Sequence, residues 1–526
     1  MIDALDDNLI HRINVGDSLT RSAARNPAAL ALSDGTRRWN YGQFNTAVNR
    51  VANALVARGL ASGQALALAS ANSIEFLVTY YACAKVGLVC VPINLGWADR
   101  EVIHVLKDSG SVGMVIEAGL LGQFGHAIAE AEVKRVFVIG DPADPVQTAF
   151  AELLTHPDDS EPRQLVDDRA PLTYLYTSGT TSAPKGVVGN HTAVYLESMA
   201  MCLEGQFRSD DSFCAVMPMF HTAQLNCHCT SAIIVGAAIH IQRGFNATAL
   251  LDLIEREHIT QLFGLPIMYR AMLEHPTIAQ RDLTSLRRAL YAMAVMPRSL
   301  IEQCLKVFNC GFYLLFGQTE MSPATTIFRP EHQLSHSRAG AAGTPMANVH
   351  VEIMDEDGNL LPRGETGEIV YRGPQVLTEY LGNAEATDKA FRHGWFHSGD
   401  VGHLDADGFL WFTDRSKDVI KTGGENVASI EVEKAILEAG PEVLEVATVG
   451  LPHPHWVEAI TAFVVPKPGT AVDPDQLRAA LRDKLDAYKI PKAIIVVPSL
   501  PKTSTGKIRK NVVREQHARH YATTGG

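Results

Sequence analysis

Residues 171–187 read PLTYLYTSGTTSAPKGV, in which an apolar, β-branched run precedes small hydroxyl and glycine residues. The run PLTYLYT is typical of a strand. Glycines let a backbone approach an anion closely, hydroxyl and N–H groups donate to phosphate oxygens, and Lys185 adds a mobile positive charge. The stretch therefore predicts a strand that leads into a polyphosphate-binding loop. The candidate ligands are Thr177, Ser178, Gly179, Thr180, Thr181 and Lys185.

The spacing in this loop excludes a P-loop nucleoside triphosphatase. That signature needs G-x-x-x-x-G-K followed by Ser or Thr, so that a hydroxyl reaches magnesium. Counted from Gly179, this chain has Pro184 where the second glycine belongs and Gly186 where the hydroxyl belongs. On this segment alone, a Ser/Gly/Thr surface loop without a ligand is the remaining alternative.

Composition narrows the class of protein. At 526 residues the chain is too long for one ordinary core, which predicts two or more domains. The 46 basic and 58 acidic residues give a net charge of −12, which argues against nucleic acid or an anionic membrane as the main partner. An acidic N-terminus and the lack of a long apolar run predict a soluble, cytoplasmic protein. The eight cysteines form no CxxC pair and are expected to be reduced thiols.

The order of the predicted elements indicates an α/β fold. From Gln64, the runs QALALAS, SIEFLVTYYACAKVG and LVCVPIN predict a strand, an amphipathic helix and a strand, and similar alternation follows. After about residue 340 the chain changes to short β segments, with hairpin signals at Asp357-Gly358 and Asp407-Gly408. From about residue 416 two strands, a helix over 473–488 and a third strand predict a small α+β domain.

We therefore expect a large N-terminal domain, residues 1–415, made of parallel-sheet α/β subdomains and a small β subdomain. A small mobile α+β domain, residues 416–526, follows it. The polar join Asp414–Asp418 suits a solvent-exposed hinge between them.

A second candidate segment, LLFGQTEMSP at 314–323, places polar residues directly after a strand-like run. The ends of strands are where α/β proteins present ligand groups. Glu320 is an oxygen ligand suited to Mg²⁺, and Thr319 is placed to donate to a phosphate or acyl oxygen. The alternative is an ordinary helix start. Phe316, Gly317 and Gln318 complete the candidate segment.

Two further segments carry candidate polar residues. Asp400 follows a Ser-Gly turn in WFHSGDVGHLDADGFLWFTDR, residues 395–415, and Arg415 ends it. An acidic side chain can grip two ribose hydroxyls, whereas the alternative is a turn aspartate and a surface arginine. His221, in PMFHTAQLNCHC at 218–229, is either a site residue or a packed core histidine.

In order along the chain, these motifs resemble those of the adenylate-forming superfamily, which holds acyl-CoA synthetases, peptide-synthetase adenylation domains and luciferases. The matching segments cover essentially the whole chain and are YTSGTTSAPKG, FGQTE, SGD, DR and PKTSTGK. Phe316 stands where the family usually has tyrosine, and Ser182 where it usually has glycine. A serine suits that position only if the backbone avoids the left-handed region, so nucleotide affinity or loop mobility is expected to differ.

The resemblance implies roles that the residues alone leave open. It places Asp400 on the ribose and Arg415 on ribose or phosphate, and it identifies Lys507 in PSLPKTSTGKIRK as the catalytic lysine. A lysine that bridges an attacking carboxylate and the α-phosphate stabilises the charge that develops there. Without the resemblance, Lys507 is one of several cations on a solvated tail.

The resemblance also implies an acyl side and a CoA side of the site. His221 lies near the acyl carboxylate, Gly423 and Gly424 line the pantetheine channel in the thioester-forming state, and Lys417 is the pivot between the domains. Small residues suit a channel that a thin chain must enter. The alternative for the two glycines is an ordinary loop before a helix.

The implied activity is that of an ATP-dependent carboxylate–CoA ligase, an AMP-forming acyl-CoA synthetase that uses ATP, Mg²⁺, CoA and a small carboxylic acid. Two alternatives stay open: an adenylation enzyme that loads a carrier protein or another nucleophile, and a non-catalytic nucleotide-binding pseudoenzyme. The acid also stays open among fatty, aryl and betaine-like classes. Residues 218–229 resemble carnitine and crotonobetaine CoA ligases, with polar Thr222, Gln224 and Asn226, whereas FGQTEMSP resembles bacterial fatty-acyl ligases.

Overall fold

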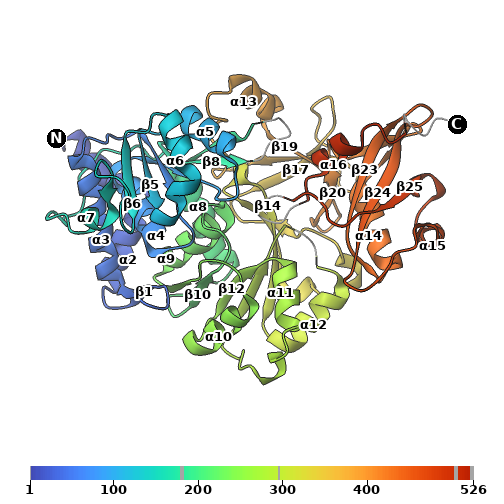
Figure 1. Cartoon of the computed structure of the whole chain (residues 1–526), viewed down its shortest axis with the longest axis horizontal. Coiled ribbons are helices and arrows are strands. Elements are labelled where there is room, and N and C mark those ends of the chain that lie inside the picture. Colours follow the sequence, from blue (N-terminus) through green and yellow to red (C-terminus); the bar gives the residue numbers. More distant parts are fainter. Residues whose placement is uncertain (1, 178–182, 294–295, 503–507, 522–526) are drawn as a thin grey trace. The chain divides into compact units, whose positions relative to one another are not determined.

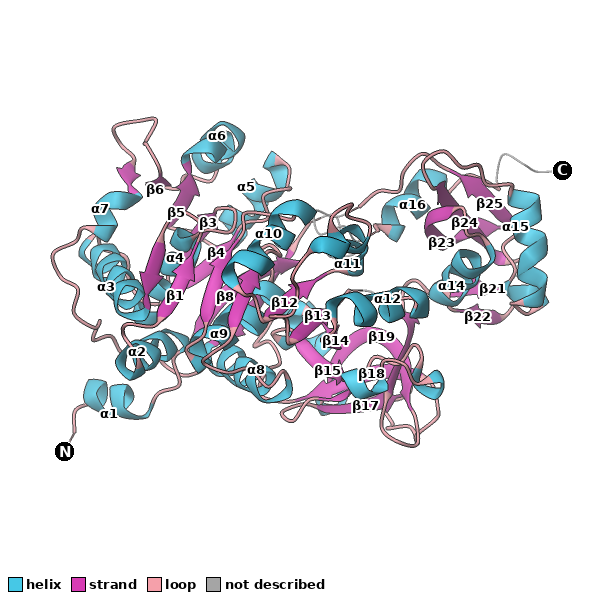
Figure 2. Ribbon diagram, turned by 90° about the horizontal axis from the view of Figure 1, so that it is seen from below, coloured by secondary structure: helices cyan, strands magenta, loops and turns pink. Residues whose placement is uncertain are grey.

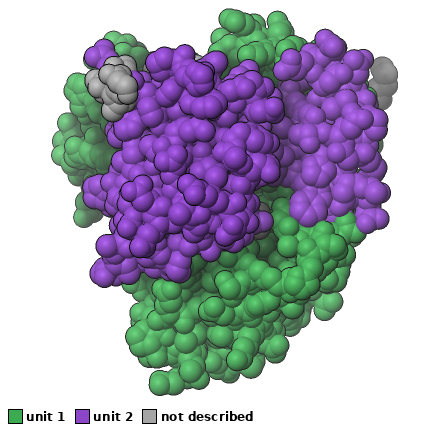
Figure 3. All heavy atoms as spheres, turned by 90° about the vertical axis from the view of Figure 1, so that its right-hand side faces the viewer, with its two compact units in different colours: residues 1–351, 371–396 green, residues 352–370, 397–526 purple. Residues whose placement is uncertain are grey.

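The computed structural model describes residues 2–177, 183–293, 296–502 and 508–521 (Figures 1 and 2). The chain divides into two compact units, residues 1–351 with 371–396 and residues 352–370 with 397–526, which Figure 3 draws in green and purple. The predicted domain boundary after residue 415 falls inside the second unit and stays a prediction.

The first unit contains a seven-stranded sheet in the order β7-β6-β5-β3-β4-β8-β9. Neighbouring strands are parallel except for the pair β8–β9, which is antiparallel. The strands are β3 (Ala65–Ala69), β4 (Val89–Pro92), β5 (Gly113–Glu117), β6 (Arg135–Ile139), β7 (Thr148–Ala149), β8 (Pro171–Thr177) and β9 (Lys185–Asn190). Helices of this region are α3 (Tyr41–Ala57), α4 (Ile74–Val86), α5 (Asp99–Asp108), α6 (Leu121–Glu130) and α7 (Phe150–Leu154).

The unit β3–α4–β4 is the one that the sequence predicts from Gln64. Ser73 caps α4 by accepting from the Phe76 amide, and Gly87 ends it in the left-handed region. Every residue of α4 is buried, Glu75 and Lys85 included, so the prediction that this helix is amphipathic is wrong.

A nine-stranded sheet in the order β16-β15-β14-β13-β12-β10-β11-β1-β2 completes the first unit. It is parallel in the centre and antiparallel at both edges. Its strands are β1 (Leu30–Ser33), β2 (Arg38–Asn40), β10 (Ser212–Ala215), β11 (Ala238–Ile241), β12 (Gln261–Gly264), β13 (Arg288–Tyr291), β14 (Gly311–Gly317), β15 (Ala324–Phe328) and β16 (Thr344–Pro345). The remaining helices are α1 (Ala4–His11), α2 (Val15–Arg25), α8 (His191–Glu204), α9 (Ser231–Val235), α10 (Ala247–Glu257), α11 (Pro266–Leu273), α12 (Arg298–Phe308) and α13 (Ala384–Ala390).

A four-stranded sheet, β17-β18-β19-β20, lies largely in the second unit. Its strands are β17 (His350–Met354), β18 (Gly367–Arg372), β19 (Phe396–Leu404) and β20 (Leu410–Arg415). Asp407-Gly408 joins β19 to β20 as the hairpin signal predicts, because Leu404 pairs with Leu410 in the antiparallel register. The Asp357-Gly358 signal gives a short turn closed by the antiparallel bridge between Met354 and Leu360.

The end of the chain forms a five-stranded sheet with apolar layers on both faces. Along β24, Ile460, Ala462 and Val464 pack on one side, while Phe463 and Val465 pack on the other. The elements are β21 (Ile420–Thr422), β22 (Glu425–Val427), β23 (Val443–His453), β24 (Val457–Pro466), β25 (Ala493–Val496), α14 (Ser429–Ala439), α15 (Pro474–Ala480) and α16 (Lys510–His517).

The predicted helix over 473–488 is shorter in the structure. α15 ends at Ala480 and a 3₁₀ turn, Leu481–Asp483, follows it. Leu481 and Leu485 are both buried in the apolar layer beside α14, so the tightened turn keeps these side chains in the core. Among the helices of the described ranges, none is long and apolar enough to cross a membrane.

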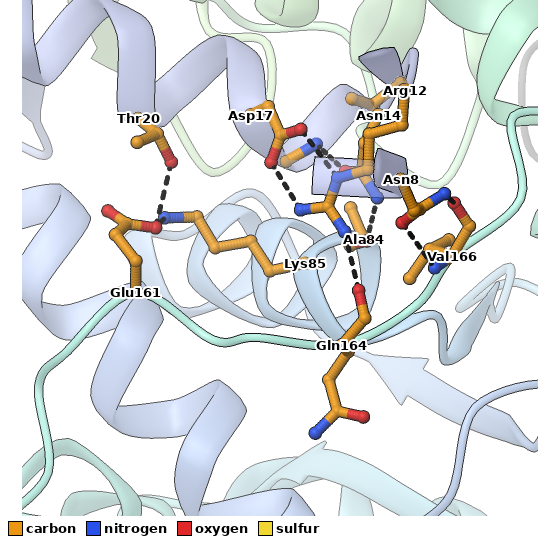
Figure 4. A network of polar contacts seen from close by, with 12 residues as sticks. Asn8, Arg12, Asn14, Asp17, Thr20, Ala84, Lys85, Glu161, Gln164 and Val166 are labelled. Carbon is orange, nitrogen blue, oxygen red and sulfur yellow. Dashed lines mark hydrogen bonds and ion pairs between the residues drawn. The ribbon is translucent and has the colours of Figure 1, made fainter. Parts of the chain in front are cut away.

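A polar network around the buried Lys85 holds the segment that leads into β8 (Figure 4). Lys85, which is 1% exposed, donates to Asn45 and Asn49 and to the carboxylate of Glu161, each at 2.7 Å. Burial lowers the pKa of Lys85, and the nearby Glu161 opposes this shift. Arg12 donates to the Gln164 carbonyl at 2.8 Å, so the N-terminal helices and α4 hold residues 161–164 from two sides.

Two buried histidines should make the free energy of unfolding fall as the pH is lowered. Burial lowers the pKa of both His191 and His228 to about 3, whereas an unfolded histidine has a pKa of about 6.5. Below that value the unfolded chain binds protons that the folded chain does not, so each histidine removes about 1.4 kcal/mol of unfolding free energy per pH unit.

Between pH 7 and pH 5, we expect the free energy of unfolding of a His228→Asn variant to fall by about 2 kcal/mol less than that of the unaltered protein. Asparagine keeps an acceptor for the Gln224 amide, which donates toward His228 Nδ1 at 3.0 Å. Denaturant unfolding at the two pH values measures this difference, and equal pH dependence in both proteins would contradict it.

Candidate active site

The strands that flank the predicted phosphate loop form an antiparallel pair. Thr177 at the end of β8 lies opposite Lys185 at the start of β9. The next helix, α8, begins only at His191, whereas in a P-loop the glycine-rich turn leads straight into a helix. The exclusion of a P-loop therefore has a structural basis as well. Ser178, Gly179, Thr180, Thr181 and Ser182 lie outside the described residues.

The Thr319–Glu320 segment is a tight turn at the end of β14. In the paired strands β12, β13 and β14, Gly264, Tyr291 and Leu314 are in register, so Phe316 and Gly317 extend beyond this edge. A Cβ on Gly317 would collide with the Pro323 carbonyl oxygen, which also accepts from the Gln318 amide. Only a 3₁₀ turn, Thr319–Met321, follows, so the alternative of an ordinary helix start does not hold.

Buried hydrogen bonds hold this turn from behind. Gln375, which is fully buried, donates to the carbonyls of Met321 and Ala324, and its own carbonyl accepts from Ser322 Oγ at 3.0 Å. These hydrogen bonds fix the backbone that directly follows Thr319 and Glu320. Gln318 Nε2 is buried and has no hydrogen-bond partner among the described residues, which suits a group that contacts a ligand.

Glu320 and Lys185 contact the same aromatic side chain. Tyr380 Oη donates to Glu320 Oε1 at 3.0 Å, and Lys185 Nζ lies 5.7 Å from the centre of the Tyr380 ring. All three belong to the first unit. The structure thus brings together two of the sequence-predicted residues through a third that the sequence analysis missed. No motif marked Tyr380, because its role depends on contacts with residues far away in the chain.

The polar residues after His221 are used within the fold. Gln224 and Asn226 belong to a buried π-helix, Ala223–Thr230, which Thr222 directly precedes. Asn226 donates to Thr222 Oγ1 at 2.8 Å and accepts from Tyr80 Oη at 3.1 Å, while the Gln224 side chain accepts from the Met217 amide at 3.0 Å. These bonds account for the polarity that suggested a betaine-like acid. His221 is half-buried and its Nδ1 accepts from the Ala223 amide at 3.2 Å, so its role at the acyl group stays a prediction.

In the second unit, Asp400 and Arg415 are direct neighbours across β19 and β20. Asp400 is 3% exposed, and Arg415 Nε lies 3.1 Å from its Oδ1. A turn aspartate and an unrelated surface arginine, the alternative on sequence, do not describe this pair. Its contact with ribose stays a prediction.

Gly423 and Gly424 form the turn between β21 and β22. Both have positive φ values, +62° and +91°, which side-chain-bearing residues rarely adopt. A Cβ on Gly423 would lie 3.1 Å from the ring of Trp456, whose carbonyl accepts from the Gly423 amide at 2.9 Å. Trp456 is a second residue that the sequence analysis missed. Lys507 lies outside the described residues.

The donors present suit Mg²⁺ that is shared with phosphates. Within the described ranges there is no group of three or more His, Cys, Asp or Glu residues able to hold a metal ion by themselves. Magnesium is commonly held by one or two carboxylates together with substrate phosphates. Glu320, whose Oε1 accepts a hydrogen bond from Tyr380, is a donor of that kind.

Comparison with known proteins gives matches along nearly the whole chain. Residues 19–381 match the model described as AMP-binding enzyme, and residues 431–507 match the AMP-binding enzyme C-terminal domain. Feruloyl-CoA synthase of Amycolatopsis sp is 35% identical, covering 95% of this chain and 99% of the relative. Indoleacetate–CoA ligase of Aromatoleum aromaticum is 32% identical, covering 96% and 99%. The crystal structure of ATP-bound MatB from Rhodopseudomonas palustris has a TM-score of 0.87 at 27% identity, covering 97% and 100%.

Proposed function

The chain belongs to the family of AMP-binding enzymes, and from this membership we propose that it is an ATP-dependent carboxylate–CoA ligase. The observation that carries the proposal is the contact of both Lys185 and Glu320 with Tyr380. One tyrosine thus contacts a cation at the start of β9 and a carboxylate in the turn that follows β14. Such a pair suits a polyphosphate and the cation that accompanies it.

The proposed reaction has two steps. In the first, a carboxylate oxygen of the acid attacks the α-phosphorus of ATP, the bond to the bridging oxygen breaks, and pyrophosphate leaves. This gives the acid a good leaving group, AMP, in place of an oxide. In the second, the CoA sulfur attacks the acyl carbon, AMP leaves, and the thiol proton is released to solvent.

We assign the first unit's residues to the phosphates. Lys185 binds phosphate oxygens, Gln318 Nε2 donates to the ligand, and Thr319 donates to a phosphate or acyl oxygen. Glu320 would hold Mg²⁺, which neutralises phosphate charge when it is bound. The loop residues from Ser178 to Thr181 are assigned to the same phosphates.

We assign the second unit's residues to the remaining parts of the substrates. Asp400 and Arg415 take the ribose, Lys507 takes the charge that develops at the α-phosphate, and Gly423 and Gly424 line the path of the CoA thiol. His221 of the first unit is assigned to the acyl carboxylate. The cytoplasmic location and the use of fatty acids stay predictions.

Pyrophosphate release across a panel of acids tests the proposal. Each aryl, short-chain, medium-chain, long-chain or betaine-like acid is incubated with ATP and Mg²⁺, with and without CoA. Aryl acids form the first arm, because the two relatives are named for acids that carry an aromatic ring. We expect pyrophosphate to be released with one class of acid, and the thioester to form only when CoA is present.

The control in each arm is a Glu320→Gln protein, which keeps the size of the side chain and loses its charge. Release without thioester would point to a carrier protein or another nucleophile as acceptor. The absence of release with every acid would contradict the proposal and favour a binding protein without turnover.

A further inference from the structure

A short segment of the first unit, residues 375–381, is hydrogen-bonded both to the strand that begins at Lys185 and to the turn that carries Glu320. On one side it pairs with β9, the strand that begins at Lys185. The Thr378 amide donates to Val188 O at 2.9 Å, and the Leu381 amide donates to Gly186 O at 2.8 Å. The segment therefore follows β9 directly behind Lys185.

On the other side the same segment holds Glu320. The Leu377 amide donates to the Glu320 carbonyl at 2.7 Å, and Tyr380 Oη donates to Glu320 Oε1 at 3.0 Å. The same segment thus holds both the backbone and the side chain of Glu320. A hydrogen bond to a charged carboxylate is stronger than one between neutral groups, so it orients the carboxylate well.

The Tyr380 side chain contacts both of these opposite charges, the ammonium through its ring and the carboxylate through its hydroxyl. Lys185 Nζ is 5.7 Å from the ring centre, within the range of a cation–π contact. Among the described residues no ion pair joins Lys185 to Glu320. A direct ion pair between this ammonium and this carboxylate would neutralise both groups as ligands. The phenol gives each of them a separate partner.

We propose that Tyr380 is a positioning residue that keeps Lys185 and Glu320 apart and correctly oriented for a polyphosphate and its divalent cation. The inference rests on the proposed function. Tyr380 acts through its neighbours: the hydroxyl orients the carboxylate and the ring holds the ammonium.

Two substitutions separate these contributions. Tyr380→Phe removes only the hydroxyl, and Tyr380→Leu removes the ring as well. The readout is the dissociation constant of ATP, measured by calorimetry over a range of Mg²⁺ concentrations, which requires neither an acid nor turnover. Tyr195→Phe is the matched control, because the Tyr195 ring also has a cation over it, Arg21 at 5.6 Å.

We expect Tyr380→Phe to raise the Mg²⁺ concentration needed for half of the ATP-binding enhancement by about tenfold. Without Mg²⁺, the dissociation constant of ATP should stay within about twofold of that of the unaltered protein, because the phenylalanine ring still provides the cation–π contact with Lys185. Tyr380→Leu should also weaken ATP binding without Mg²⁺ by about fivefold. Tyr195→Phe should match the unaltered protein.

A double-substitution cycle with Glu320→Gln distinguishes positioning from a structural role. If Tyr380 acts through Glu320, Tyr380→Phe should change Mg²⁺-linked binding by less than about twofold in the Glu320→Gln background. Equal fold-changes in both backgrounds, or an unchanged Mg²⁺ dependence in Tyr380→Phe, would overturn the assignment. The proposed function fails separately, if ATP binds normally and no acid supports release.

Discussion

A Lys507→Ala protein is expected to form acyl adenylate about 100- to 1,000-fold more slowly than the unaltered protein, while its affinity for ATP changes by less than about threefold. The loss falls on the rate because a lysine that meets charge only as the carboxylate reaches the α-phosphate stabilises the transition state more than the ground state. Rapid-quench measurement of pyrophosphate gives the rate, and calorimetry gives the affinity.

The substitution should leave the surrounding fold intact. On either side of residues 503–507, Lys502 and Ile508 form an antiparallel bridge, and the Arg509 amide donates to Pro501 O at 2.8 Å. Lys502→Ala is the matched control, because this half-exposed lysine pairs with Glu445 and such a surface pair contributes little. Equal losses of rate and of ATP affinity in Lys507→Ala would remove Lys507 from its assigned role.

The second large effect is expected at Lys417, which the family resemblance makes the pivot between domains. Proline at this position fixes φ near −65° and restricts Ser416 as well, so it should block a rotation of the backbone there. We expect Lys417→Pro to release pyrophosphate within about threefold of the normal rate and to form thioester at least about 100-fold more slowly.

Hydrogen bonds on either side of Lys417 close the turn in which it lies. The Asp418 and Val419 amides both donate to Arg415 O, at 2.8 and 3.1 Å, and close the turn without the Lys417 amide. Lys417→Ala is the control, since it removes the charge and keeps the freedom of φ. If both steps fall together in Lys417→Pro, the pivot lies elsewhere and the predicted boundary after residue 415 is wrong.

Local sequence patterns predicted where helices and strands lie, but they did not predict which strands pair with each other. The strand–helix–strand run from Gln64 could be predicted because α4 is rich in apolar residues and is capped by Ser73 and Gly87. In contrast, β1 pairs with β11, so Leu32 lies beside Ile239, and no local pattern marks such a partner. The shortened helix after Asp473 follows from burial of later leucines, which is also a long-range effect.

The candidate site divides in the same way. The motif resemblance, rather than the residue types alone, pointed Glu320, Asp400 and Arg415 to nucleotide chemistry, because each of these side chains also has an ordinary structural use in a helix start, a turn or a surface. Tyr380 and Trp456 could not be predicted, since each acquires its role from a segment far away in the chain. Polar side chains such as Asn226 misdirect in the same manner, because their hydrogen bonds lie inside the fold.

The distribution of thiols makes the chain convenient for spectroscopy. Six of the eight cysteines are buried, Cys202 and Cys310 are partly exposed, and none lies beyond residue 310. Burial raises the pKa of both partly exposed thiols to about 12, so they react slowly with maleimide probes near neutral pH. One cysteine introduced on an exposed position after residue 416 would therefore accept a fluorophore selectively, and its signal would follow the C-terminal segment through a single turnover.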